Sequence, residues 1–126
     1  MKVKEIMSKN VVTITKGCLI TEAAEIMRKK DISCLVVTCG DTVEGIVTER
    51  DVLRKIVANQ KMFHQIQIKE IMSYPVVTTD GELSIHETLK IMEEKHIRRL
   101  VISKNNKLAG IVTESDFVKI LRKLNI

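Results

Sequence analysis

The chain has 126 residues, enough for one domain or for two very small ones. Hydrophobic residues make up 44% and charged residues 29%, the composition of a folded protein rather than a disordered one. The net charge of +5 divides evenly, +3 over residues 1–63 and +2 over residues 64–126, which excludes a basic arm or an acidic tail. No apolar run approaches the ~20 residues of a membrane span, and the first residues lack the apolar stretch of a secretory signal. We therefore expect a cytoplasmic protein.

The cysteines and aromatic residues exclude two further classes of site. Cys18, Cys34 and Cys39 form no CxxC pair, and the three histidines do not stand at zinc-ligand spacing beside them. We expect reduced thiols that pack as small hydrophobic groups, and no metal site. Only three aromatic residues are present, which argues against stacking of nucleic-acid bases on an aromatic platform.

An internal duplication organises the sequence. Residues 3–56 align without a gap with residues 68–121, and 22 of the 54 aligned positions are identical. Two unrelated segments would share only a few identities, so the chain contains two copies of one unit.

Each copy follows the order strand, helix, strand, strand, helix. A β-branched run at 11–14 predicts the first strand. Apolar residues then recur at helical spacing, and Ser84 to Glu87 adds a capping box in the second copy. Strands follow at 35–37 and 100–102, turn-rich hairpin loops at 39–42 and 104–107, and third strands that begin at Gly45 and Gly110. The helical positions are Ile20, Ala23, Ala24 and Met27 in the first copy and Ile85, Thr88, Leu89 and Met92 in the second; the final helices carry Val52, Leu53, Ile56 and Val57, and Phe117, Val118 and Leu121, each set on one face.

These elements predict an α/β (α+β) fold of two βαββα repeats, packed sheet to sheet with pseudo-twofold symmetry. A unit of this size buries too little apolar surface to be stable alone, and two copies packed together solve that problem. We expect domains at residues 7–65 and 72–126. Residues 1–6 and 66–71 are lead-in or linker segments, and the Lys-Glu-Ile-Met-Ser strings near them are expected to form short helical turns.

One motif, Gly-Ile-Val-Thr-Glu-x-Asp, joins the third strand to the last helix in both copies, at 45–51 and 110–116. Thr and Asp three residues apart can simply cap the helix. The same junction can also bind a ligand, because its free N–H groups and hydroxyl suit a phosphate and the carboxylate can accept both hydroxyls of a ribose. We expect the preceding glycine to let a ligand approach the backbone. The repetition of the whole string favours the ligand-binding interpretation.

The ordered set Ile-Met-Ser, Val-Val-Thr and Gly-Ile-Val-Thr-Glu-x-Asp, present twice, resembles a tandem pair of CBS domains, also called a Bateman module. The resemblance covers residues 3–121. It implies a regulatory, energy-sensing, non-enzymatic module that binds adenine nucleotides (AMP, ADP or ATP) in clefts between the repeats and signals to a protein partner. AMP is the foremost ligand, S-adenosylmethionine and NAD are alternatives, and no cofactor or metal is implied.

The resemblance also implies two sets of site residues. Thr48 and Asp51, and Thr113 and Asp116, would contact phosphate and ribose, while the first strands would contact adenine. Arg98 and Arg99 would bind the phosphate of the ligand at Asp51, whereas the matching residues for the other site are uncharged. We therefore predict that the Asp51 site is the tighter one for phosphorylated ligands. The predicted site A comprises Val12, Thr13, Ile46, Thr48, Asp51, Arg98 and Arg99; site B comprises Val77, Thr78, Ile111, Thr113, Asp116, Ser33 and Cys34.

Other functions have weaker support in the sequence. Glu49 and Glu114 could be a general acid–base pair, but no nucleophile accompanies them. A pI near 9.2 would suit nucleic-acid binding, against which stand the even charge and the few aromatic residues; a nucleotide-independent scaffold is the other alternative. His96 could touch phosphate or lie at the surface. We also expect a homodimer formed through the apolar faces of the final helices, with an effector protein on a separate chain and no membrane contact.

Overall fold

The computed structural model describes residues 1–124, with Phe63 described by its backbone alone. The chain folds into two compact units. Val12–Val76 forms one, which we call the contiguous unit; Met1–Val11 together with the chain from Val77 onward forms the other, the split unit. The boundaries predicted from the repeat, residues 7–65 and 72–126, follow the sequence copies, whereas the units exchange the lead-in segments. The last two residues of the second predicted domain lie outside the described residues.

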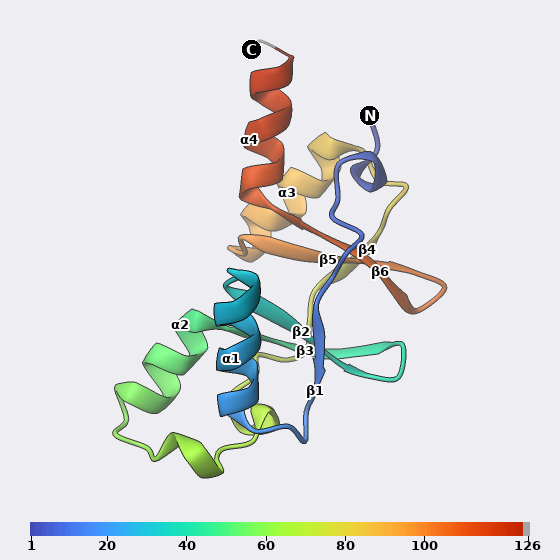
Figure 1. Cartoon of the computed structure of the whole chain (residues 1–126). Helices are drawn as coiled ribbons and strands as arrows, with labels where there is room; N and C mark the ends of the chain where they lie inside the picture. Colours follow the sequence, from blue (N-terminus) through green and yellow to red (C-terminus); the bar gives the residue numbers. More distant parts are fainter. Residues whose placement is uncertain (125–126) are drawn as a thin grey trace. The chain divides into compact units, whose positions relative to one another are not determined.

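Each unit contains the predicted order of strands and helices (Figure 1). The contiguous unit holds β1 (Thr13–Thr15), α1 (Ile20–Lys30), β2 (Cys34–Cys39), β3 (Thr42–Thr48) and α2 (Glu49–Asp51), which continues as a π-helix over Val52–Val57, then 3-10 turns at Phe63–Gln65 and Ile68–Glu70. The split unit holds a 3-10 turn at Val3–Glu5, β4 (Thr78–Asp80), α3 (Ile85–Lys95), β5 (Arg99–Lys104), β6 (Lys107–Thr113) and α4 (Glu114–Lys123). The predicted α/β class with two βαββα repeats is confirmed.

Both units contain a mixed three-stranded sheet. β1 runs parallel to β2 and β2 antiparallel to β3, and the same holds for β4, β5 and β6. The parallel pair needs a crossover, which α1 and α3 provide. The hairpins close through two-residue turns in which Gly40, Asn105 and Asn106 have positive φ, as turns of this kind require. Among residues 1–124, no helix combines the length and the apolar character needed to cross a bilayer.

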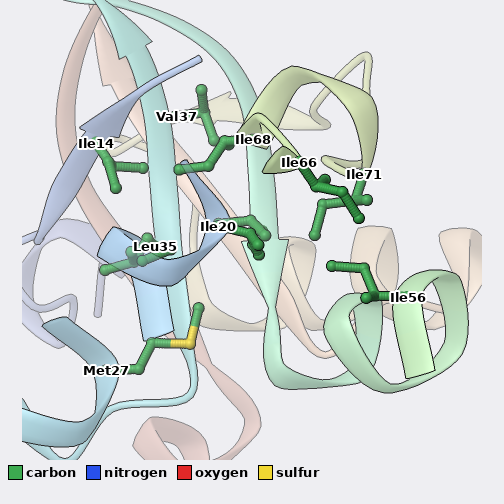
Figure 2. Close-up of a cluster of buried hydrophobic side chains, with 11 residues drawn as sticks. Ile14, Ile20, Met27, Leu35, Val37, Ile56, Ile66, Ile68 and Ile71 are labelled. Atoms are coloured by element: carbon green, nitrogen blue, oxygen red, sulfur yellow. The ribbon is translucent and has the colours of Figure 1, made fainter. Parts of the chain in front are cut away.

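The core of the contiguous unit lies between one face of its sheet and its helices. Alternate strand residues such as Leu35, Val37 and Val47 are fully buried there. Ile20 and Met27 of α1 pack against them, and Figure 2 shows this cluster. Ala23 is buried as predicted, but Ala24 is exposed. The matching core of the split unit is built from Met92, Leu100, Ile102, Val112 and Phe117, with Val3 from the start of the chain.

The two lead-in segments each pack onto the unit of the other repeat. The segment before the second copy is in the contiguous unit, where Ile68 and Ile71 are almost completely buried. The segment before the first copy is in the split unit, where Val3 is fully buried. Both begin with the predicted short helical turn, a 3-10 turn that buries its first apolar residue. The sequence copies are therefore interleaved in the fold.

Ion pairs also hold the first segment to the split unit. Lys2 and Lys4 both donate to the carboxylate of Glu82, Lys4 at 2.6 Å. These bonds hold the pKa of the Glu82 carboxyl at about 2, below its ordinary value of 4.5. The attraction is present above pH 4.5 and is lost only as the pH falls through about 2. Because all three side chains are exposed, the pairs contribute little to stability.

The final helices differ from the prediction. Their apolar residues do not all share one buried face: Ile56 and Phe117 are buried, whereas Leu53 and Val57 are 61% and 50% exposed. The segment that holds Leu53 and Val57 is wound as a π-helix, which has more residues per turn than an α-helix. Val118 and Leu121 are likewise nearly half exposed on α4.

Candidate functional site

Asp51 caps the helix that follows β3. Thr48 is the N-cap residue, and its hydroxyl accepts a hydrogen bond from the Asp51 amide at 3.1 Å. Asp51 Oδ2 accepts in return from the Thr48 amide at 2.9 Å and from the Thr48 hydroxyl at 3.1 Å. The helix-capping interpretation of the motif is thus confirmed, and Asp51 is buried, with 8% of the residue exposed.

The second oxygen of Asp51 is also in use. Lys55 Nζ lies 3.1 Å from Oδ1, and the Ser73 hydroxyl donates to the same oxygen at 3.3 Å. Lys55 donates further to the carbonyl of Ile71 at 2.7 Å, so it joins the helix to the lead-in segment. A ribose could therefore bond to Asp51 only by displacing these donors. Sequence reasoning missed Lys55 and Ser73; the signal for Lys55 was a lysine one helical turn after Asp51 that the second repeat lacks.

Asp116 has fewer partners. Its Oδ2 accepts from the Thr113 amide at 2.9 Å and from the Thr113 hydroxyl at 3.3 Å. The Thr113 hydroxyl also shares a hydrogen bond of 2.8 Å with that of Ser115. Ile120 stands where the first repeat has Lys55, and within residues 1–124 Asp116 forms no ion pair. Asp116 is partly exposed, so one carboxylate oxygen is available to a ligand.

The glycines before these motifs leave room for the lead-in segments of the chain. The expectation that they let a ligand approach the backbone stays a prediction. A Cβ at Gly45 would lie 2.7 Å from the sulfur of Met72 and 3.0 Å from the carbonyl oxygen of Ser73. At Gly110, the corresponding distances to Met7 and to the Ser8 carbonyl oxygen are 2.6 and 2.8 Å. The lead-in segments occupy the space that the missing side chains leave.

The predicted first-strand and third-strand residues share a row across each sheet. Thr13 pairs with Val36, Val36 with Ile46, and Ile46 with Ser73 through hydrogen bonds of 3.1 and 2.8 Å between backbone groups. The residues next to this row along the strands face the helices, so the row itself lies on the opposite face of the sheet. Thr48 lies on that face too, because it is two residues beyond Ile46. Val12 precedes the row, and its carbonyl accepts from the Val36 amide. The split unit repeats the row with Thr78, Val101, Ile111 and Ser8, and Val77 precedes it.

The residues at the start of the second strands lie beside the caps of their own units. Cys34 is the register partner of Thr48, and Arg99 is that of Thr113. The Ser33 and Arg98 carbonyls accept from the amides of the residues after those threonines. Directly paired residues project on the same face, so Arg99 brings its charge to the Thr113 cap. The predicted assignment of Arg98 and Arg99 to a ligand at Asp51, and of Ser33 and Cys34 to one at Asp116, stays a prediction.

Comparison with known sequences identifies relatives over almost the whole chain. The CBS domain family matches residues 3–58 and 68–123. Hypoxic response protein 1 of Mycobacterium tuberculosis is 32% identical over 118 residues, which are 92% of this chain and 82% of the relative. An uncharacterized protein of Methanopyrus kandleri is 35% identical over 122 residues, 95% of this chain. The chain spans 62% of that relative, and only 40% and 32% of two relatives from Methanocaldococcus jannaschii.

Solved structures share the fold. A CBS-domain protein of Burkholderia ambifaria, named for signal transduction, has a TM-score of 0.88 at 31% identity, covering 96% of this chain and 93% of that one. Hypoxic Response Protein I, crystallised with two coordinated zinc ions, has a TM-score of 0.83 at 31% identity and covers 94% and 98%. A hexameric CBS-CP12 protein of bloom-forming cyanobacteria has a TM-score of 0.83 at 30% identity and covers 94% and 69%. In the described part of this chain, no three His, Cys, Asp or Glu side chains gather to hold a metal. The chain therefore belongs to the CBS domain family, as a tandem pair of CBS domains.

Proposed function

We propose that this CBS pair is a regulatory module that binds adenosine-containing nucleotides, AMP foremost, and signals their presence to a protein partner. The observation that carries the proposal is the doubled arrangement of a capped carboxylate and a strand row on the sheet face away from the helices. In each unit, Thr48 or Thr113 continues the sheet face that holds Thr13 or Thr78. A nucleoside along this row would place its base near the first strand and its ribose near the carboxylate. The signal-transduction name of the Burkholderia relative agrees with this role.

The contacts of the two carboxylates support unequal sites. Asp116 offers an unused oxygen to the ribose hydroxyls, whereas Asp51 must first release Lys55 and Ser73. We therefore propose that Asp116 takes the ribose more readily. The prediction that the Asp51 site is the tighter one for phosphorylated ligands rests instead on the arginines. The carboxylates thus bear on the ribose, and the arginines bear on the phosphate.

Calorimetric titration with adenosine and AMP separates these arguments. We expect Asp116→Ala to weaken adenosine about 10- to 100-fold, because a hydrogen bond to a charged group contributes roughly 1.5–3 kcal/mol. Asp51→Ala should change adenosine binding less and AMP binding more. Equal effects of the two substitutions on both ligands would contradict the proposed inequality. No binding of AMP, ADP, ATP, S-adenosylmethionine or NAD to the unaltered chain would contradict the function itself.

Arg99 tests the phosphate contact. Arg99→Ala should weaken AMP far more than adenosine, because a guanidinium suits a phosphate and adenosine lacks one. The difference between the ligands should shrink at high salt, since a partly exposed charge pair is screened. An equal loss for both ligands would mean that Arg99 supports the fold and does not contact the phosphate.

We propose that the ligand acts by shifting a conformational population and not by chemistry. A ligand shifts such an equilibrium only by its differential affinity, typically about 1–3 kcal/mol of coupling. Incubation with ATP should give no hydrolysis above a blank. Turnover that a site substitution abolishes would contradict this.

We also propose a cytoplasmic homodimer that forms through helices. Within the described residues none of the three cysteines forms a disulfide, which suits a reducing compartment. The last helices and the residue after them expose more apolar side chains than a solvated surface needs, and the cyanobacterial CBS-CP12 relative is hexameric. Those residues are Leu53, Val57, Val118, Leu121 and Leu124.

A further inference from the structure

Three side chains of the contiguous unit join its last helix to the lead-in segment before the second copy. Asp51 and Lys55 lie one turn apart on the helix, and Ser73 lies in the segment. Both donors reach Asp51 Oδ1, Lys55 Nζ at 3.1 Å and the Ser73 hydroxyl at 3.3 Å. Lys55 Nζ also donates to the Ile71 carbonyl oxygen at 2.7 Å. We call Asp51, Lys55 and Ser73 the Asp51 cluster.

The backbone holds this segment less extensively. Ile71 is buried in the same core cluster as Ile56 of the helix (Figure 2), which anchors the segment at that residue. Beyond it, Ser73 is exposed and pairs with Ile46 in an isolated bridge, with bonds of 2.8 and 3.1 Å. The cluster therefore adds side-chain bonds exactly where the backbone has few. From here the chain runs through Val77 into β4 of the split unit.

The matching place in the split unit has the backbone bridge without the side-chain bonds. Ser8 pairs with Ile111 through bonds of 2.9 and 3.0 Å, much as Ser73 pairs with Ile46. No lysine follows Asp116 one turn later, and among residues 1–124 its carboxylate receives no bond from the Ser8 hydroxyl. Only the first of the two carboxylates is thus bonded to a lead-in segment.

We propose that a ribose bound at Asp51 displaces Lys55 and Ser73 from the carboxylate and so loosens the lead-in segment around Ser73. The proposal rests on the nucleotide binding proposed above and adds how occupancy of this site changes the chain. A ribose offers two hydroxyl donors, and a carboxylate has about four acceptor positions. Two of them, on Oδ2, are taken by the Thr48 cap, so the hydroxyls compete for Oδ1.

The displacement leaves each part of the segment with fewer bonds. The ammonium of Lys55 keeps the Ile71 carbonyl alone, and Ser73 keeps its backbone bridge alone. A short attachment of this kind opens locally without unfolding of the whole unit. A ribose at Asp116 removes no such donor, because one oxygen of that carboxylate is available. One ligand bound at both sites should therefore loosen one lead-in segment and leave the other as it is.

Amide hydrogen exchange, measured residue by residue by NMR, tests the displacement. AMP at saturation, established by calorimetry, should speed exchange of the Ser73 and Ile46 amides relative to the Ser8 and Ile111 amides. The expected factor is about 5- to 30-fold, which corresponds to the loss of one or two hydrogen bonds. The second pair of amides is the internal control, because it forms the same bridge without the side-chain bonds.

Substitution should reproduce the effect without a ligand. Lys55→Met with Ser73→Ala removes both donors to Oδ1, and exchange of the Ile46 amide should rise by a similar factor. AMP should then raise it little further, because no donor remains to be displaced. Lys61→Met removes one positive charge from an exposed position of the same unit and should leave exchange unchanged. Thermal unfolding checks that both variants are folded; the AMP comparison on the unaltered chain needs neither.

The outcomes separate this inference from the proposed function. AMP that binds without faster exchange at Ser73 and Ile46 would overturn the displacement and leave nucleotide binding standing. Equal acceleration at Ser8 and Ile111 would overturn it too, as would an unchanged Ile46 amide in the folded chain with Lys55→Met and Ser73→Ala. Absence of saturable AMP binding to the unaltered chain would overturn the proposed function and this inference with it.

Discussion

Asp51 and Asp116 stand at the same position of the repeat, yet their carboxylates have different partners. Both accept from the threonine three residues earlier, since this bond is local and forms wherever the helix begins. Only Asp51 also meets Lys55 and Ser73. The contact with Lys55 depends on a single side chain of the helix, and the contact with Ser73 depends on the position of the lead-in segment.

Exchange of the residues at positions 55 and 120 tests whether Lys55 restricts the Asp51 site. Lys55→Ile is made together with Asp116→Ala so that only the Asp51 site binds. It should strengthen adenosine binding about tenfold, about 1.4 kcal/mol, because it removes the charged one of the two donors to Oδ1. Ile120→Lys together with Asp51→Ala should weaken it by a similar factor. Calorimetry gives both values. Weaker adenosine binding after Lys55→Ile would mean that Lys55 assists the ligand.

Substitution of the glycines before the motifs should destabilise the chain. Gly45→Ala and Gly110→Ala should each lower the free energy of unfolding by about 1–3 kcal/mol, because the new Cβ meets a backbone carbonyl oxygen that cannot turn away. Gly17→Ala is the matched control, since its Cβ would have no atom within 4 Å, and it should change stability by less than about 0.5 kcal/mol. Urea denaturation measures all three. If the three substitutions changed the free energy of unfolding equally, the lead-in segments would be able to move aside for the new Cβ atoms.

The short lead-in turns contribute buried side chains to the cores of the two units. Ile68 is fully buried in the contiguous unit although its turn is only three residues long. Ile68→Ala should destabilise this unit by about 2–5 kcal/mol, and Ile68→Val by about 0.5–1.5 kcal/mol. Hydrogen exchange should show faster exchange in β1 to β3 than in β4 to β6. Equal acceleration in both sets of strands would contradict the assignment of this segment to one unit.

The repeat predicted most elements, because their signals are local. Alternating strands, helical spacing and turn residues at Gly40 and Asn105 need no knowledge of the rest of the chain. Of the capping box predicted at the start of α3, the bond from the Glu87 amide to the Ser84 hydroxyl forms. In α1 the reciprocal bond forms, in which the Glu22 carboxylate accepts from the Leu19 amide. The π-helix and the exchanged lead-in segments were not predicted, since both depend on packing between residues distant in sequence.

At the scale of the whole molecule, ligand binding and stability should be linked. A ligand that binds only the folded chain stabilises it by about 2.7 kcal/mol at 100 times its dissociation constant. AMP at that concentration should raise the thermal midpoint, and Asp51→Ala with Asp116→Ala should abolish the rise. A midpoint that rises equally in the doubly substituted chain would show that AMP binds elsewhere.

The exchanged lead-in segments impose an order on folding during synthesis. Every residue of the contiguous unit, Val12–Val76, has been made before any residue from Val77 onward leaves the ribosome, so this unit can fold while translation continues. Met1–Val11 precedes it along the chain but has no folded surface to join until β6 exists, because Ser8 pairs with Ile111. Buried Val3 must therefore stay exposed through most of translation. A permuted gene that opens the chain between Val76 and Val77 and joins its ends through a short linker would remove that wait.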